Sequence, residues 1–236
     1  MPYKYEIHAH GMETSKCGHM KAVEVVRLLK EAGYQGVCFT DHFHSGWVHQ
    51  QDCRDDWQAC MERFLSGYHE AEEYGNKIDF DVILGAELRC PENNNDYLLY
   101  GLDEKWFREN PYVMQLSERE FFDKYGSELL IIQAHPYREG NMEVHPEYIH
   151  GIEIVNANPR HDNMNEKALE LALHHRKLIR TCGSDVHRTE DVGYAGILVD
   201  HRLKDSKDLK RTIESGEYGL WCPSCEEIIR ISEENK

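Results

Sequence analysis

Short apolar segments of this sequence run directly into single histidines or carboxylates, and stretches with helical periodicity separate these segments. One helical stretch is 22–32 (AVEVVRLLKEA), which ends at Gly33, and the apolar run 36–40 (GVCFT) follows it. Strands that alternate with helices predict an α/β fold with a parallel, barrel-like sheet. In such barrels the C-terminal ends of the strands form the active site. We therefore expect one pocket to collect the residues that follow five of the runs: His8, His42, Glu87, His135 and Asp185.

The same alternation predicts the elements and the extent of the domain. Strands are expected at 3–8, 36–40, 81–85, 97–101, 129–133, 152–155, 178–181 and 195–199. Helices are expected at 22–32, 57–74, 118–125 and 165–175. Barrels of this kind commonly run roughly 200 to 250 residues as one unit, and no linker, charge block or internal repeat interrupts the 236 residues of this chain. We expect a single domain over residues 1–236.

The charge balance and the N-terminal sequence restrict the partners and the location. The formal net charge is −16, and a surface of that sign repels polyphosphate backbones unless a local basic or metal-filled cleft reverses the field. The first residues (MPYKYEIHAH) match no targeting signal, and no stretch approaches about 18 apolar residues. These features predict a cytoplasmic protein with no membrane partner. Its eight cysteines are then expected to be reduced thiols.

Two pairs of ionisable residues share one spacing. His8 and His10 flank a single residue, and side chains two apart on an extended strand point the same way, so both imidazoles can reach one metal ion. A lone pair of this kind is more often two hydrogen-bonded histidines. Asp185 and His187 repeat the spacing at another strand end, and this recurrence favours a metal site.

Two further residues at strand ends fit the same site. Glu87 follows an apolar strand, and its carboxylate can bridge two metal ions about 3.5 to 4 Å apart. A glutamate in such a position is more often a solvated carboxylate at the rim. His135 precedes Pro136, which favours extended backbone at His135 and ends the strand there.

In their order along the chain, these residues resemble the PHP (polymerase and histidinol phosphatase) superfamily. The resemblance rests on five motifs that span nearly the whole chain: His8-x-His10, Thr40-Asp41-His42, Gly85-Ala86-Glu87, Ala134-His135-Pro136 and Gly183-Ser184-Asp185-x-His187. It implies a distorted, seven-stranded (β/α)7 TIM-like barrel with two or three divalent metal ions, which are zinc, manganese or iron. It also implies hydrolysis of phosphate esters.

The resemblance assigns metal ligands as well. It implies one ion held by His8, His10, Glu87 and Asp185, a second held by Glu87 and His135, and a third held by His42 and His187. Glu87 and Asp185 are then catalytic residues, because they hold ions that lower the pKa of a bound water and neutralise charge on the phosphate. Asp41 would orient a ligand imidazole through its other nitrogen.

Two more ligand positions depart from the simplest pattern of the family. Many members place a ligand a few residues after the first pair, where this chain offers Cys17 and His19, and we favour His19. Another ligand, often a histidine, lies on the strand after the glutamate, where Asp96 and Asp103 are available, and we favour Asp96. A carboxylate in place of an imidazole shifts the preference towards harder ions such as manganese or iron(II).

Two arginines are expected to supply fixed cations for the substrate phosphate. Arg138 lies three residues beyond His135, and Arg160 follows the run that ends near Val155, so both can reach over the same rim. A solvent-facing arginine is an equally common outcome at each position.

The expected substrate is a small phosphomonoester, similar to histidinol phosphate or to a sugar or nucleotide phosphate. A nuclease or nucleotide phosphodiesterase is the alternative enzyme, but the acidic composition and the lack of a basic, aromatic-lined stripe argue against a nucleic acid partner. A non-catalytic metal-binding module is the other alternative. Loss of activity normally shows as missing ligands, and here all seven principal positions are filled, which favours an enzyme. The sequence leaves the oligomeric state open.

Overall fold

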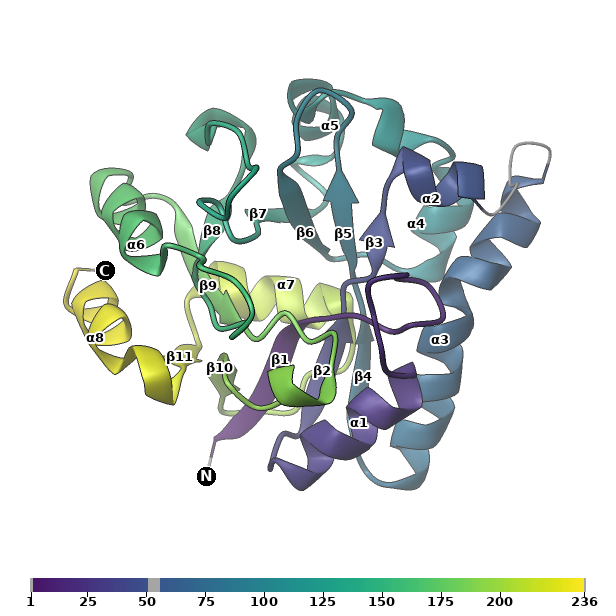
Figure 1. Cartoon of the computed structure of the whole chain (residues 1–236), viewed down its shortest axis with the longest axis horizontal. Helices are drawn as coiled ribbons and strands as arrows, with labels where there is room; N and C mark the ends of the chain where they lie inside the picture. Colours follow the sequence, from purple (N-terminus) through teal and green to yellow (C-terminus); the bar gives the residue numbers. More distant parts are fainter. Residues whose placement is uncertain (1, 51–55, 236) are drawn as a thin grey trace.

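Eleven strands form two sheets in the computed structural model, which describes residues 2–50 and 56–235 (Figure 1). The strands are β1 (Tyr3–Ala9), β2 (Gly36–Phe39), β3 (His42–Phe43), β4 (Asp81–Leu84), β5 (Ala86–Arg89), β6 (Asp96–Tyr100), β7 (Leu130–Gln133), β8 (Gly151–Asn156), β9 (Ile179–Gly183), β10 (Gly196–Val199) and β11 (Gly219–Trp221). The first sheet has the order β11-β10-β1-β2-β4, and the second has the order β3-β5-β6-β7-β8-β9.

Helices surround the two sheets. They are α1 (Ala22–Glu31), α2 (Ser45–Gln50), α3 (Trp57–Lys77), α4 (Glu104–Glu109), α5 (Glu118–Tyr125), α6 (Asn165–His174), α7 (Ser206–Ser215) and α8 (Glu226–Glu234). Short 3-10 turns lie at Val113–Gln115, Pro146–Tyr148, Thr189–Asp191 and Pro223–Cys225. Figure 1 shows α1 and α3 on one side of the molecule and α6 and α8 on the opposite side.

Within the described residues the chain crosses between the two sheets four times, after β2, β3, β4 and β9, which makes the arrangement barrel-like. β2 of the first sheet leads to β3 of the second, and only Gly85 separates β4 from β5. A bridge between Ala9 and Val186 places the end of β1 beside the segment that follows β9. These features confirm the predicted α/β fold. The sheets are mixed, however, because β6 pairs antiparallel with both of its neighbours, and β10 pairs antiparallel with β1 and β11.

Local sequence explains where the helices form. α1 buries one face with helical spacing, made of Ala22, Val25, Val26 and Leu29. The Asp56 side chain caps α3 by accepting a hydrogen bond from the backbone N–H of Ala59 at 3.0 Å. At α5, Ser117 and Glu120 form a capping box, in which each side chain binds the backbone of the other residue.

Apolar side chains fill the space between these layers. The larger core cluster includes Tyr97 and Tyr100 of β6, and the Tyr100 hydroxyl donates to the backbone oxygen of Ile7 at 2.8 Å, so its polar end is satisfied although it is buried. A smaller cluster packs Leu29 of α1 against Phe39 of β2. The ends of the strands are thereby held in fixed positions for the site described below.

All eight predicted strands and all four predicted helices are present, with ends that differ by a few residues. The structure adds the strands β3, β5 and β11 and the helices α2, α4, α7 and α8. β3 and β11, with two and three residues, are too short to show a periodic pattern. The expectation of reduced thiols is wrong at Cys60, which is disulfide-bonded, whereas six other cysteines carry free thiols. None of the helices in the described residues has both the length and the apolar character that a membrane crossing requires.

Candidate metal centre

The structure brings the seven principal predicted ligands into one cluster. They come from β1 and its end (His8 and His10), from β3 (His42), from β5 (Glu87) and from the segments after β7 (His135) and β9 (Asp185 and His187). All of them are buried except His42, which is partly buried. Residues that lie far apart in the sequence therefore share one pocket at the ends of their strands.

Glu87 lies at the centre of this cluster. Its Oε1 is 3.3 Å from His8 Nε2 and 3.3 Å from His135 Nε2. Its Oε2 is 2.6 Å from His42 Nδ1 and 3.6 Å from His10 Nε2. One carboxylate thus contacts four imidazoles, an arrangement that suits a carboxylate shared between two cations.

Asp185 is the second central carboxylate. Its Oδ1 lies 3.4 Å from His8 Nε2, 3.4 Å from His10 Nε2 and 3.2 Å from His187 Nδ1. Its Oδ2 accepts a hydrogen bond from Arg138 Nη2 at 2.6 Å. One oxygen therefore faces the histidines and the other is fixed by a guanidinium group.

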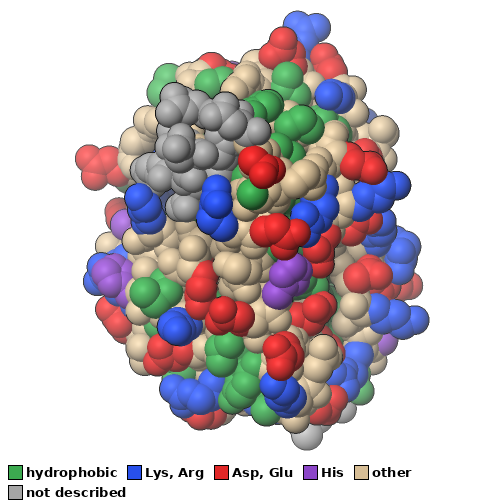
Figure 2. Space-filling view, turned by 90° about the vertical axis from the view of Figure 1, so that its right-hand side faces the viewer, with side chains coloured by type: hydrophobic (Ala, Val, Ile, Leu, Met, Phe, Trp, Pro, Cys, Tyr) green, Lys and Arg blue, Asp and Glu red, His purple; other side chains and the backbone are tan. Residues whose placement is uncertain are grey.

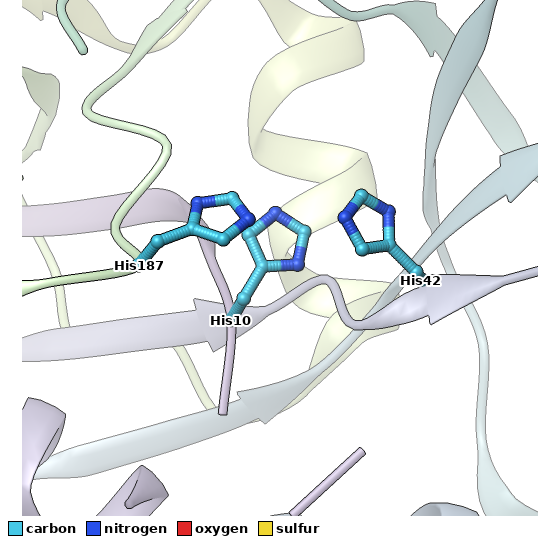
Figure 3. Close-up of side chains that lie close together, drawn as sticks. All are labelled: His10, His42 and His187. Atoms are coloured by element: carbon cyan, nitrogen blue, oxygen red, sulfur yellow. The ribbon is translucent and has the colours of Figure 1, made fainter. Parts of the chain in front are cut away.

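Three imidazoles form the outer part of the cluster (Figure 3). The ring of His10 lies between the other two, with ring centroids 4.5 Å from His42 and 4.2 Å from His187. Among residues 2–50 and 56–235, four groups of three residues have donor atoms that all lie within 4.8 Å of one another: His10, His42 and His187; His8, Glu87 and His135; His8, His10 and Asp185; and His42, Glu87 and Asp96.

Buried nitrogen atoms without partners indicate that these residues fit a metal ion. Within the described part of the chain, His8 Nε2 and His10 Nε2 are buried and have no hydrogen-bond partner. Burial and the neighbouring His187 hold the pKa of His10 well below its usual range, so its imidazole is neutral. An unsatisfied buried polar atom costs about 1 to 3 kcal/mol, and a neutral imidazole is the form that binds metal.

The carboxylates are in their metal-binding form as well. Although burial opposes ionisation, His42 and the other contacting imidazoles hold the pKa of Glu87 well below its usual range. His8 and Arg138 do the same for Asp185, again against the effect of burial. Both groups therefore stay ionised at neutral pH, as metal coordination requires.

Glu153 orients the imidazoles from beneath the cluster, and the sequence interpretation did not identify it. Its Oε1 lies 2.9 Å from His8 Nδ1, while its Oε2 accepts from the backbone N–H of His135 at 3.0 Å and from Asn156 Nδ2 at 2.9 Å. This contact fixes the His8 ring so that Nε2 faces the carboxylates. The signal in the sequence is a glutamate between two isoleucines in the apolar run 152–155.

Asp41 acts on the imidazoles only through another residue. Its Oδ1 accepts hydrogen bonds from the Ser15 hydroxyl at 2.7 Å and from the backbone N–H of Gly11 at 2.9 Å. The Ser15 hydroxyl lies 3.4 Å from His10 Nδ1. Ser15 therefore stands between Asp41 and the ligand imidazole that Asp41 was expected to orient directly.

Two of the site residues have left-handed backbone conformations. The backbone φ angle is 29° at His135 and 54° at Asp185. The extended backbone expected at His135 because of Pro136 is therefore wrong. The Glu153 carboxylate binds the His135 N–H, and this buried contact outweighs the local preference. Such conformations cost of order 1 to 3 kcal/mol and cluster at functional sites.

Of the two residues offered for the ligand after the first histidine pair, Cys17 lies closer to the cluster. Its Sγ is 3.1 Å from His42 Nε2 and 3.1 Å from His187 Nε2. The side chain of His19, which was favoured from the sequence, is exposed, and its Nε2 lies 3.2 Å from Arg188 Nη2.

Asp96 and Asp103 lie in different parts of the molecule. Asp96 is buried at the cluster, where both of its oxygens pair with Arg89 and its Oδ2 lies 3.9 Å from His135 Nε2. Asp103 caps α4, pairs with Lys207 at 2.6 Å and lines a different cavity. Asp96 therefore lies beside the cluster, whereas Asp103 lies elsewhere.

A cavity of about 590 Å³ opens above the cluster. Its lining includes four arginines: Arg89, Arg138, Arg160 and Arg188. Arg138 is anchored by Asp185 and by Asn163, whose Oδ1 accepts from Nε at 2.8 Å. Arg160 pairs with the buried Asp191 through Nε at 3.0 Å and Nη2 at 2.9 Å. Both arginines are therefore held at the rim of the site.

A cluster of buried imidazoles and carboxylates at the ends of barrel strands defines a metal-binding α/β protein. The sequence matches the PHP domain over residues 6–214, so the chain belongs to the PHP domain family. This match confirms the family that the motifs indicated. No curated protein matches the sequence.

Three solved structures share the fold at low sequence identity. A two-domain protein from Bacteroides vulgatus that contains a predicted PHP-like metal-dependent phosphoesterase is 18% identical, with a TM-score of 0.68 over 100% of this chain and 70% of that chain. PsfC from Pseudomonas syringae is 14% identical, with a TM-score of 0.62 over 98% of this chain and 96% of that chain. An amidohydrolase from Chromobacterium violaceum with bound sulfate and no metal is 14% identical, with a TM-score of 0.52 over 94% of this chain and 99% of that chain.

Proposed function

We propose that this protein is a metal-dependent phosphoesterase that hydrolyses a small phosphomonoester with a metal-activated water. One observation carries the proposal. The Nε2 atoms of His8 and His10 are buried, have no hydrogen-bond partner among the described residues, and face the carboxylates of Glu87 and Asp185 below an arginine-lined cavity. Membership of the PHP domain family supports the same enzyme class.

The residues of the chain divide the work between them. His8, His10 and Asp185 would hold one ion, and His135 would hold a second. Glu87 would contribute to both sites. When bound, such ions lower the pKa of a coordinated water and neutralise charge on the phosphate oxygens. Contacts with Glu87 and with Arg138 hold the His135 and Asp185 side chains in the cluster before substrate binds.

The size and the charge of the cavity favour a small anionic substrate. About 590 Å³ is within the usual range for a small-molecule site. Four arginines line this cavity in a chain with a net charge of −16, which supports an anionic substrate there. Figure 2 shows acidic and basic side chains interspersed over the face that carries α3, which does not favour a long polyanion there.

A substrate comparison tests this proposal. The metal-free protein is reconstituted with Zn²⁺, Mn²⁺ or Fe²⁺ and assayed with p-nitrophenyl phosphate, histidinol phosphate and single-stranded DNA. We expect turnover of a phosphomonoester that a chelator abolishes and added metal restores. Activity confined to DNA would instead identify a nuclease and overturn the choice of substrate class.

Arg138 is expected to bind the substrate phosphate and to hold Asp185. We predict that Arg138→Ala lowers kcat/KM for a phosphomonoester by about 10- to 100-fold, the equivalent of one lost hydrogen bond to a charged group. Steady-state kinetics would also show a partial rescue by Arg138→Lys. Arg27→Ala, which removes an exposed arginine of α1, is the control. Unchanged kinetics in Arg138→Ala would rule out this role.

Glu153 is expected to act on the metal through His8. We predict that Glu153→Gln weakens metal binding by about 10- to 100-fold, because the amide no longer fixes the charge and orientation of the imidazole. Titration of the metal-free protein with Zn²⁺ measures this affinity. Glu170→Gln makes the same change on an exposed side chain and should leave the affinity unaltered. Equal affinities in the two variants would contradict the role of Glu153.

A further inference from the structure

Cys17 lies between two imidazoles at the wall of the cavity. Its Sγ is 3.1 Å from the Nε2 atom of both His42 and His187. The three side chains come from separate parts of the chain, namely the loop after β1, the strand β3 and the segment after β9. Donors of a tetrahedral zinc site, with bonds of about 2.3 Å to sulfur and 2.0 to 2.1 Å to nitrogen, lie about 3.5 Å apart. The observed distances are close to this separation.

The second nitrogen of each imidazole already has an oxygen neighbour. His42 Nδ1 lies 2.6 Å from Glu87 Oε2, and His187 Nδ1 lies 3.0 Å from the backbone oxygen of Asp185. A metal-binding imidazole typically has its other nitrogen held in this way, because the contact fixes the ring and aims the free nitrogen at the ion. Both Nε2 atoms are thereby directed towards the sulfur.

An independent observation places a further donor at the same corner. His10 is buried, its Nε2 has no hydrogen-bond partner among the described residues, and its ring lies between those of His42 and His187 (Figure 3). The three imidazoles offer donor atoms within 4.8 Å of one another. Cys17 therefore borders a group of metal-ligating side chains and is not an isolated surface thiol.

We propose that the Cys17 thiolate, together with His42 and His187, binds one divalent ion and makes this position selective for Zn²⁺ over Mn²⁺. The proposal rests on the metal-binding part of the proposed function. A thiolate is a soft ligand, which favours zinc, whereas carboxylates favour harder ions. The sequence-based preference for His19 is not adopted, because its Nε2 lies beside Arg188 Nη2 at 3.2 Å, whereas the Cys17 sulfur lies beside two imidazoles.

Cobalt substitution tests the sulfur ligand directly. The metal-free whole chain is loaded with Co²⁺, and bound cobalt is counted per chain while the near-ultraviolet thiolate-to-cobalt charge-transfer band is recorded. Cys17→Ser and Cys17→Ala are compared with His19→Ala, a matched control two residues away, and the other cysteines are the same in all proteins. We expect the band in the wild type and in His19→Ala. In both Cys17 variants it should disappear, and the Kd of one ion should rise by about 10- to 100-fold.

Competition and turnover complete the test. Wild type and His19→Ala should retain one Zn²⁺ in an excess of Mn²⁺, whereas Cys17→Ser should lose this preference. A band that persists in Cys17→Ala, or one that disappears in His19→Ala, would overturn the proposal. Turnover of p-nitrophenyl phosphate is measured on the same samples. If the wild type turns over this substrate but lacks the charge-transfer band, the Cys17 site alone is contradicted. If the wild type shows the band but no turnover, the phosphoesterase proposal alone is contradicted. Cys17 is exposed, so its replacement should leave the fold intact, which circular dichroism checks.

Discussion

Replacing Glu87 with glutamine is expected to lower kcat for a phosphomonoester by about 10³-fold, equivalent to about 4 kcal/mol in the activation free energy. Both oxygens of this carboxylate contact imidazoles, among them His8 at 3.3 Å and His42 at 2.6 Å. A glutamine removes the negative charge and turns an NH₂ group towards at least one of these rings. The variant should therefore bind less metal at the two sites to which Glu87 would contribute. It should also lose the stabilisation that bound metal gives to the transition state.

The Glu87 variant requires two measurements and one control. Metal content per chain and kcat should fall together, while circular dichroism should show a folded protein. Glu143→Gln makes the same chemical change on an exposed side chain and should behave as the wild type does. If Glu87→Gln loses metal but keeps its activity within about tenfold, the cluster is not the catalytic centre.

A methyl group at Gly183 is expected to destabilise the protein by about 1 to 3 kcal/mol. Gly183 ends β9 where this strand passes under β1, and a Cβ atom there would lie 2.6 Å from the Cβ of His8 and 2.9 Å from Glu153 Oε1. Neither neighbour can move freely, because the two are in contact with each other at 2.9 Å. Gly183→Ala should therefore displace His8 and weaken metal binding as well as folding.

Thermal unfolding measures the effect at Gly183. For a chain of this size, the expected loss lowers the melting temperature by roughly 2 to 12 °C. Gly219→Ala is the matched control, because Gly219 also lies in a strand and its added Cβ would meet nothing closer than Leu198 at 3.9 Å. If both variants melt at the temperature of the wild type, β1 and β9 are not packed as tightly as the structure shows.

The sequence predicted the strands and the cluster because both depend on local pattern. Apolar runs that end in His8, Glu87 or Asp185 are visible without a structure, and strand ends in a barrel meet at one rim. Contacts that cross between strands have no such pattern. Glu153 stands between two isoleucines in an apolar run, but only the fold shows that its carboxylate contacts His8 and the His135 N–H.

Side-chain direction and backbone conformation could not be predicted from the sequence either. Cys17 and His19 are two residues apart in one loop, and spacing alone cannot decide which of them lies beside His42 and His187. At His135, the following proline predicts extended backbone, but the φ angle is 29°. Tertiary contacts determined the conformation in both places, and a rule that considers only neighbours along the chain cannot include them.

The predicted metal ligands come from both sheets, and this should affect the amount of the protein in a cell. His8 and His10 are held by β1 of the first sheet, whereas Glu87 lies in β5 and Asp185 follows β9, both in the second sheet. An ion bound to both sets would cross-link the sheets and would bind only the folded chain. A ligand of that kind raises stability with its free concentration. Metal starvation would then expose the chain to proteolysis, and a cell short of the ion would lose the protein as well as its turnover.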